Sequence, residues 1–144
     1  MLIILSALLE AMAAQAQRDH PIETCGVIAG AVGSKLPTRL IPMRNAAQSE
    51  TFFRFDPQEQ LRVWREMEVR DEEPKVIYHS HTASLAYPSR EDVLYAAEPD
   101  VHYVILSSAP GAGAALRSFR IVGGRVTEES IRVVERYVAA VATQ

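Results

Sequence analysis

The sequence predicts a single α/β domain over residues 1–144, with a mixed central β-sheet flanked by helices. Continuous apolar runs at 76–81 and 102–107 are typical of buried strands. Segments 5–16 and 61–67 instead carry apolar residues at helical spacing. A chain of 144 residues suits one hydrophobic core, and it contains no internal repeat or low-complexity linker.

Composition narrows the class of protein. Hydrophobic residues make up 48% and charged residues 23%, as in soluble globular domains, and a net charge of -3 gives no basis for nucleic-acid binding. The single cysteine, Cys25, excludes an intrachain disulfide and a multi-cysteine zinc knuckle, so we expect a cytoplasmic protein in which Cys25 is a small core residue. The sequence does not indicate an oligomeric state.

The apolar N-terminus superficially resembles a secretory signal peptide. Residues 1–9 are apolar, but they lack a basic flank and Glu10 interrupts the run, so we expect no cleaved signal peptide. No apolar run approaches the roughly 20 residues that span a bilayer, so we expect no membrane anchor.

The first half of the chain predicts alternating strands and helices. A short strand at 2–5 precedes a helix capped by Ser6 that ends near His20-Pro21, where His20 is interpreted as a boundary residue. Strands at 22–30 and 38–44 are expected to form a hairpin, followed by an aromatic strand at 52–55.

A second helix should begin at Asp56-Pro57-Gln58-Glu59. Asp56 would be the N-cap, Pro57 would take the first helical position, and Glu59 would reciprocate the cap. Along this helix Leu61, Trp64 and Met67 recur at helical spacing, which predicts a buried stripe.

The second half predicts a central strand at 76–81 after Pro74, a short helix at 89–97 and a strand at 102–107 whose His102 is a solvated edge residue. Residues 110–113 should form a loop. Strands at 116–122 and 125–133 flank Gly123-Gly124, a strong hairpin signal, and a short helix is expected within 134–141.

The chemistry is concentrated around the central strand. Because alternate strand residues share a face, His79 and His81 project from the same side, roughly 7 Å apart along the backbone. Asp92 follows eleven residues later, and catalytic zinc commonly takes three protein ligands and leaves one position for water. Two imidazoles and a carboxylate suit zinc, which would lower the pKa of a bound water toward about 7, so amide hydrolysis is a natural reaction.

Hydrolysis would also need a proton carrier and a donor for the developing oxyanion. Glu23 and Ser89 are candidates, although Glu91 or Glu98 could equally supply the carboxylate. Ser89 and Asp92 also have capping-box spacing, and the two histidines could be a satisfied pair at a sheet edge. Sequence position alone leaves these alternatives open.

These motifs resemble the JAMM (MPN+) metalloprotease family. The pattern consists of His79-Ser80-His81, seven residues, Ser89, two residues and Asp92, with Glu23 upstream, and every element of the family motif is present. The surrounding segments 23–30, 51–56, 78–83 and 86–89 are similar to the bacterial branch of that family, and the similarity extends from about residue 19 to 134.

The resemblance implies a deaminase-like α/β fold and one Zn²⁺ per chain held by His79, His81 and Asp92. It also makes Glu23 the general acid/base and Ser89 the oxyanion donor. The implied reaction is hydrolysis of the bond between the C-terminal glycine of a ubiquitin-like sulfur carrier protein and an attached cysteine. Thr82 stands where the family's eukaryotic deubiquitinases usually carry proline, which weakens any ubiquitin-chain reading.

Further expectations concern the substrate and the alternative functions. A Gly-Gly tail would lie extended and could add to a sheet edge, and Arg54, among its phenylalanines, is hypothesised to bind a carboxylate of the cysteine or the carrier. A peptidase for another sulfur carrier or its precursor is the alternative. A second alternative is a metal-free MPN scaffold domain that only binds partners. Such domains typically lack metal ligands, whereas this sequence has all of them.

Overall fold

The computed structural model describes residues 1–109 and 116–138. Three helices and eight strands follow one another in these residues. In chain order they are β1 (Leu2–Leu5), α1 (Ser6–Asp19), β2 (Cys25–Ala31), β3 (Arg39–Met43), α2 (Pro57–Val69), β4 (Glu72–His81), α3 (Arg90–Tyr95), β5 (His102–Ser107), β6 (Leu116–Val122), β7 (Arg125–Glu129) and β8 (Ile131–Val134).

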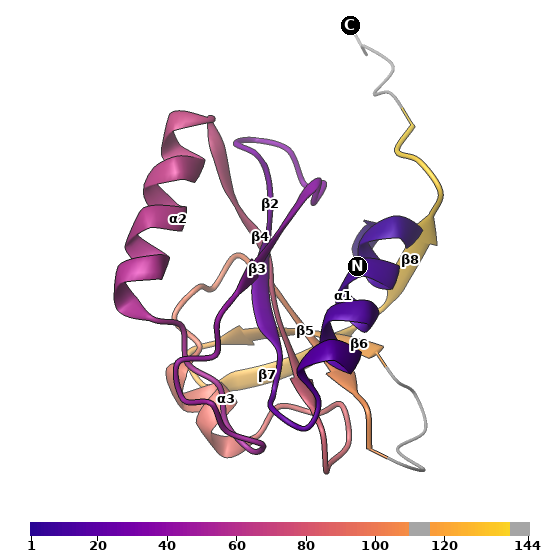
Figure 1. Cartoon of the computed structure of the whole chain (residues 1–144). Coiled ribbons are helices and arrows are strands. Elements are labelled where there is room, and N and C mark those ends of the chain that lie inside the picture. The colour runs from indigo at the N-terminus through magenta and orange to yellow at the C-terminus, as the bar shows by residue number, and fades with distance from the viewer. Residues whose placement is uncertain (110–115, 139–144) are drawn as a thin grey trace, which may run out of the picture.

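The predicted mixed sheet with flanking helices is confirmed. Six strands lie in the order β3-β2-β4-β5-β6-β7, in which only β4 and β5 are parallel neighbours. Figure 1 shows α2 on one side of the sheet and α1 on the other. One apolar cluster, which includes Val63, Met67 and Ile105, fills the α2 side, and a second, which includes Leu8, Met12 and Tyr78, fills the α1 side.

Strand β4 occupies the middle of the sheet. It pairs with β2 and β5, so His79 lies opposite Cys25 on one side and Ile105 on the other. Every residue from Lys75 to His81 is buried. The carboxyl end of an interior strand therefore carries both histidines, where backbone hydrogen bonds on two sides restrict its movement.

Strand β4 is longer than the sequence predicts. Strand β4 begins at Glu72 and includes Pro74, which the prediction placed before the strand. The register with β2 shifts between Ile28 and Ala29, beside Pro74, and such an irregularity accommodates a residue that has no N–H to donate.

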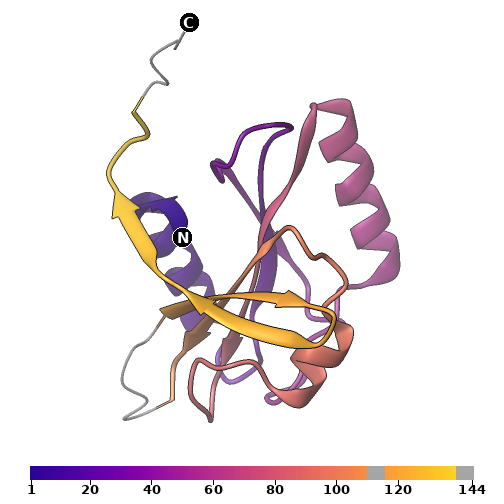
Figure 2. The ribbon, with the colours of Figure 1, turned by 180° about the vertical axis from the view of Figure 1, so that it is seen from behind.

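The predicted strand at 125–133 is divided. Strand β7 ends at Glu129, and Ser130 accepts a hydrogen bond from Leu2 N at 2.9 Å. Strand β8 then pairs in parallel with β1 instead of staying in the large sheet. Figure 2 shows β7 and β8 as a continuous strip that runs from the sheet to α1.

The three helices of the described residues lie where the sequence predicts them, but some details of the prediction were wrong. Helix α1 has Leu5 as N-cap without a side-chain bond, so Ser6 is its first residue and not its cap. Asp56 caps α2 as predicted, accepting from Glu59 N at 2.9 Å. The Glu59 carboxylate instead accepts from Arg44 N at 3.0 Å, because β3 passes close enough to compete for it.

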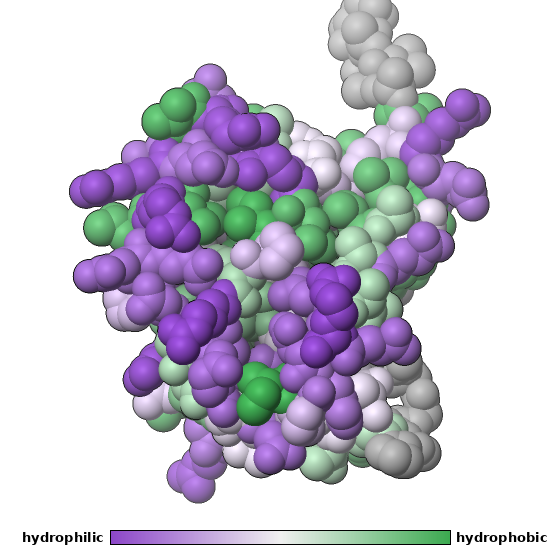
Figure 3. Space-filling model, in the orientation of Figure 1, coloured by the Kyte–Doolittle hydropathy of each residue, from purple (hydrophilic) through white to green (hydrophobic). Residues whose placement is uncertain are grey.

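The residues that α2 buries differ in part from the predicted Leu61, Trp64 and Met67. Val63 and Met67 are buried and Trp64 is half-buried, whereas Leu61 is 52% exposed. A spacing of four places Val63 and Met67 directly above one another, and that pair faces the sheet. Figure 3 shows mainly hydrophilic residues in the region of α2, with some hydrophobic residues among them.

Other local expectations had mixed outcomes. Residues 52–55 form a loop with one isolated bridge, Asn45 to Phe55, so the predicted aromatic strand is wrong. His102 is buried and lies 2.6 Å from Glu129, so it is not a solvated edge residue. Residues 135–138 are not helical, while the expected loop at 110–113 and the end of the tail lie outside the described residues. Within the described ranges, no helix has the length and apolarity needed to cross a membrane.

Candidate metal centre

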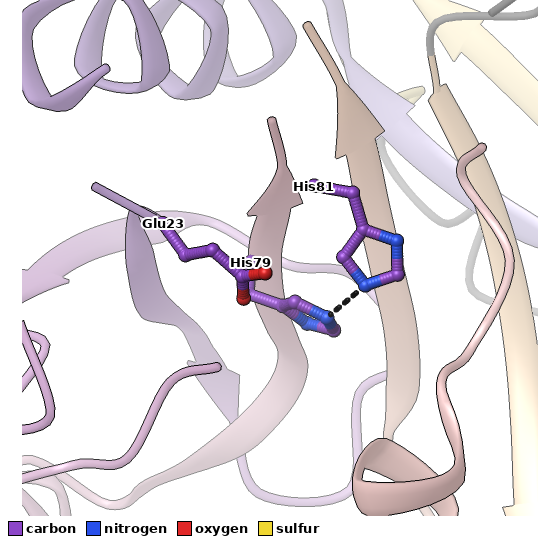
Figure 4. A group of neighbouring side chains, drawn as sticks. All are labelled: Glu23, His79 and His81. Carbon is purple, nitrogen blue, oxygen red and sulfur yellow. Dashed lines mark hydrogen bonds between the residues drawn. The ribbon is translucent and has the colours of Figure 1, made fainter. Parts of the chain in front are cut away.

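Three ligand atoms converge at the carboxyl end of β4. The Nε2 atoms of His79 and His81 are 3.1 Å apart, and each lies 3.1 Å from Oδ2 of Asp92. Figure 4 shows the two imidazoles facing one another, with the Glu23 carboxylate alongside. The side chains of these three candidate ligands are at least nine-tenths buried.

These distances fit a tetrahedral ion. Ligands about 2.0–2.1 Å from zinc in a tetrahedron are about 3.3 Å from one another, close to the separations observed. His81 Nδ1 lies 2.8 Å from the carbonyl oxygen of Leu85, and donation of Nδ1–H to it leaves the Nε2 lone pair free to bind a metal. The donor set therefore suits a divalent metal ion, and its combination of imidazole and carboxylate is compatible with zinc.

Asp92 is held in place by the helix start that was predicted for it. Ser89 is the N-cap of α3, its hydroxyl accepts from Asp92 N at 3.1 Å, and its N–H donates to Asp92 Oδ2 at 2.8 Å. Burial alone would raise the pKa of Asp92, but hydrogen bonds from His79, His81 and Ser89 outweigh it and hold the pKa well below its usual value. The carboxylate is therefore charged and available as a ligand.

Glu23 joins the cluster from the segment that precedes β2. One ligand atom each from Glu23, His79 and His81 lie within 4.8 Å of one another, and all three residues are buried. Burial raises the pKa of Glu23 to about 8, with an opposing effect of His81 and a further increase from the charge of Asp92. A cation beside it would lower this pKa again, since opposite charge favours the carboxylate. Such a group can take and return a proton near neutral pH.

The structure brings together the predicted residues and separates the alternatives. Glu91 and Glu98 line a cavity of about 460 Å³ beside the histidines, and neither belongs to the cluster of Glu23, His79 and His81. Arg54, exposed on the loop, also lines this cavity, as do His79 and Asp92. Ser89 is half-buried, and its O–H has no acceptor within the described part of the chain, so it is available to donate.

Sequence reasoning missed two residues that touch the histidines. Phe53 stacks on His79 with ring centroids 4.4 Å apart and an interplanar angle of 23°. The Leu85 carbonyl orients His81. The aromatic run at 52–55 was a signal for the first, but a backbone carbonyl in a loop has no sequence signature.

Phe53→Leu should weaken metal binding about tenfold, because a support that fixes the orientation of a ligating imidazole commonly affects metal affinity by about 10–100-fold. Competition with a chromophoric chelator would measure this. Phe55→Leu is the matched control, since Phe55 lies against Trp64 and Phe53 and, among the described residues, does not stack on His79. Equal affinities in the two variants would contradict the effect.

The chain belongs to the family described as prokaryotic homologs of the JAB domain, whose model matches residues 5–122. It is a JAMM-type peptidase. A protein of Mycobacterium tuberculosis named CysO-cysteine peptidase is 59% identical over 136 residues, which cover 94% of this chain and 93% of that protein.

Solved structures share the fold. A Desulfitobacterium hafniense protein with 33% identity superposes with a TM-score of 0.82 and covers 94% of both chains. A structure described as JAMM, a metalloprotease-like zinc site in the proteasome and signalosome, has 19% identity and a TM-score of 0.60, covering 94% of this chain and 99% of that chain. The second likeness concerns the fold alone.

Proposed function

We propose that this protein is a zinc-dependent peptidase that hydrolyses the bond between the C-terminal glycine of a ubiquitin-like sulfur carrier and an attached cysteine. The observation that carries the proposal is the convergence of His79, His81 and Asp92 at mutual separations of 3.1 Å, with Glu23 beside them. The relative named CysO-cysteine peptidase supports the substrate. The buried Cys25 accords with the proposed location, the cytoplasm.

The residues divide the reaction among them. When bound, zinc makes a water more acidic and polarises the scissile carbonyl. Glu23 takes the proton from the attacking water and returns it to the nitrogen of the leaving cysteine. The Ser89 hydroxyl donates to the oxygen on which negative charge develops. The amide bond breaks, and the carrier is released with a free glycine carboxylate.

The test is incubation of the purified protein with a carrier-Gly-Gly-cysteine adduct, followed by mass spectrometry of the carrier. We expect loss of the mass of cysteine, abolition of that loss by a chelator and its restoration by zinc. Intact adduct after prolonged incubation with zinc-loaded protein would reject the substrate. Loss of other residues from other carriers would then support the alternative peptidase, and protein purified without chelator that holds no metal would support a scaffold.

Ser89→Ala should lower kcat about 100-fold with the metal retained, because removing one oxyanion donor typically has an effect of this size. The variant should also lose about 1 kcal/mol of stability with the N-cap. Ser89→Thr keeps both the hydroxyl and the cap and should retain most activity. A full-rate Ser89→Ala enzyme would remove the oxyanion role, whatever its stability.

The cavity beside the metal centre supports a role for Arg54. Its lining is largely aromatic and aliphatic, it reaches both His79 and Asp92, and Arg54 is the only Arg or Lys among the described residues that line it. A leaving cysteine carries a free carboxylate next to the scissile bond, and a guanidinium binds such a group through charge-assisted hydrogen bonds. Glu91 and Glu98 in the same lining oppose that attraction, so the contribution of Arg54 should be moderate.

Arg54→Ala should raise KM for the cysteine adduct about tenfold with little change in kcat, because the contact would be made equally before and during the reaction. Steady-state kinetics on the adduct would show this. Arg65→Ala removes an exposed arginine from α2 and is the matched control. Unchanged kinetics in Arg54→Ala would end the proposal for this residue.

A further inference from the structure

Glu23 precedes β2 and takes no part in the hydrogen-bond ladder of that strand. Strand β2 begins at Cys25, and Thr24 is held by Ser80 through two bonds, Thr24 N to Ser80 Oγ at 2.8 Å and Ser80 N to Thr24 O at 3.0 Å. The backbone of Glu23 has different partners. Its N–H donates to Ser49 O at 2.9 Å, and its carbonyl accepts from Asn45 Nδ2 at 3.1 Å. Both partners lie in the loop 45–55, so this loop sets the position of the Glu23 backbone.

The side chain of Asn45 connects the two ends of that loop through hydrogen bonds. Its side chain is 4% exposed, and Nδ2 also donates to Phe52 O at 2.9 Å. Its Oδ1 accepts from Ala47 N at 3.0 Å and from Arg54 N at 3.2 Å. Two carbonyls face the amide nitrogen and two N–H groups face its oxygen, so only one orientation of the amide satisfies all four. The hydrogen-bonding capacity of this amide is used, and none remains for a substrate.

The same loop reaches the metal ligands. Asn45 bonds the backbone of Phe52 and of Arg54, and Phe53 between them stacks on His79. Thr82, which follows His81, donates from Oγ1 to Glu50 O at 3.0 Å. The loop 45–55 therefore contacts the proton carrier and the strand of the histidines together, and Asn45 fixes its two arms to each other.

We propose that Asn45 is a positioning residue for hydrolysis, which acts by fixing the backbone of Glu23 so that its carboxylate stays beside the metal ligands. This inference rests on the proposed role of Glu23. Removing the amide leaves the carbonyls of Glu23 and Phe52 without a buried donor, and the loop must shift to reach water or another partner. Misplacement of a catalytic group by about 1 Å can cost about 100-fold in rate.

The distinguishing readout is which kinetic constant changes. Asn45→Ala should lower kcat about 10–100-fold on the carrier-Gly-Gly-cysteine adduct, while KM and zinc affinity stay within about twofold. General loosening of the loop would instead also weaken zinc binding through Phe53. Amide hydrogen exchange provides a readout without catalysis, and the Glu23 N–H should exchange at least about tenfold faster in the variant.

Ser49→Ala is the matched control. It removes the bond from Thr51 N to Ser49 Oγ in the same loop but keeps the backbone carbonyl that holds Glu23. Its kinetics and its Glu23 exchange should equal those of the wild type. If Asn45→Ala does not fold, Asn45→Asp serves in its place, since it keeps the shape and the acceptors and removes both donors.

The outcomes separate the inference from the proposed function. Unchanged kcat in a folded Asn45 variant, a loss shared with KM or zinc affinity, or unchanged exchange of the Glu23 amide would each overturn the inference. Failure of the wild type to cleave the adduct, or full activity of Glu23→Gln, would overturn the proposed function or the role of Glu23. In those two cases the exchange measurement still decides whether Asn45 holds Glu23.

Discussion

Asp92→Asn should abolish hydrolysis, with kcat/KM reduced at least about 1,000-fold at stoichiometric zinc. The carboxylate supplies the only negative charge among the three converging ligand atoms, and the neutral amide is a much poorer partner for a divalent ion. Without the ion the pKa of water rises from about 7 back to its much higher bulk value, so little nucleophile forms at neutral pH. Metal analysis and adduct hydrolysis on the same preparation would measure both effects.

The fold should survive this substitution, because the amide oxygen of the new side chain can still accept from Ser89 N and the cap of α3 can persist. Thermal unfolding without metal would check this. Asp100→Asn, which neutralises an exposed carboxylate soon after α3, is the control and should bind zinc and turn over normally. A zinc-loaded, active Asp92→Asn enzyme would show that Asp92 is not a ligand.

The candidate site was largely predictable because its geometry follows from local rules. Alternation along a strand places His79 and His81 on one face, and capping-box spacing places Asp92 and Ser89 at one helix start. What local rules could not supply was the approach of Glu23, which precedes β2 and whose backbone is bonded by Asn45 and Ser49 of the loop 45–55. The choice of Glu23 over Glu91 and Glu98 came from family resemblance. In the structure Glu23 lies in one cluster with His79 and His81.

The errors share a different cause. The aromatic run 52–55 has the composition of a strand, yet its backbone is held by the amide of Asn45, a contact seven residues distant that no periodicity reveals. The predicted strand 125–133 has a continuous pattern, but its second half pairs with β1 at the other end of the chain. His102 was judged by its place at the start of β5, whereas Glu129 on β7 decides its burial. Each error reflects tertiary pairing that overrides a local pattern.

Glu23→Gln should lower kcat about 100–10,000-fold with zinc content unchanged, because the amide preserves the shape of the side chain but cannot accept the proton of the attacking water. Its effect is expected in kcat more than in KM, since the proton is transferred only during the reaction. Kinetics on the cysteine adduct with parallel metal analysis would show this. Activity equal to that of the wild type would remove Glu23 from its proposed role.

The same substitution should stabilise the metal-free protein. The pKa of Glu23 is raised from 4.5 to about 8 in the fold, chiefly by burial. Between these values the folded state keeps a proton that the unfolded state releases, so stability falls as pH rises through this window. Glu23→Gln removes that dependence, and at pH 7 it should add up to about 3 kcal/mol of unfolding free energy, measurable by urea titration at pH 5 and pH 7. If Glu23 is a buried catalytic carboxyl, Glu23→Gln should lose activity and gain stability. If its role is purely structural, the variant should lose both activity and stability.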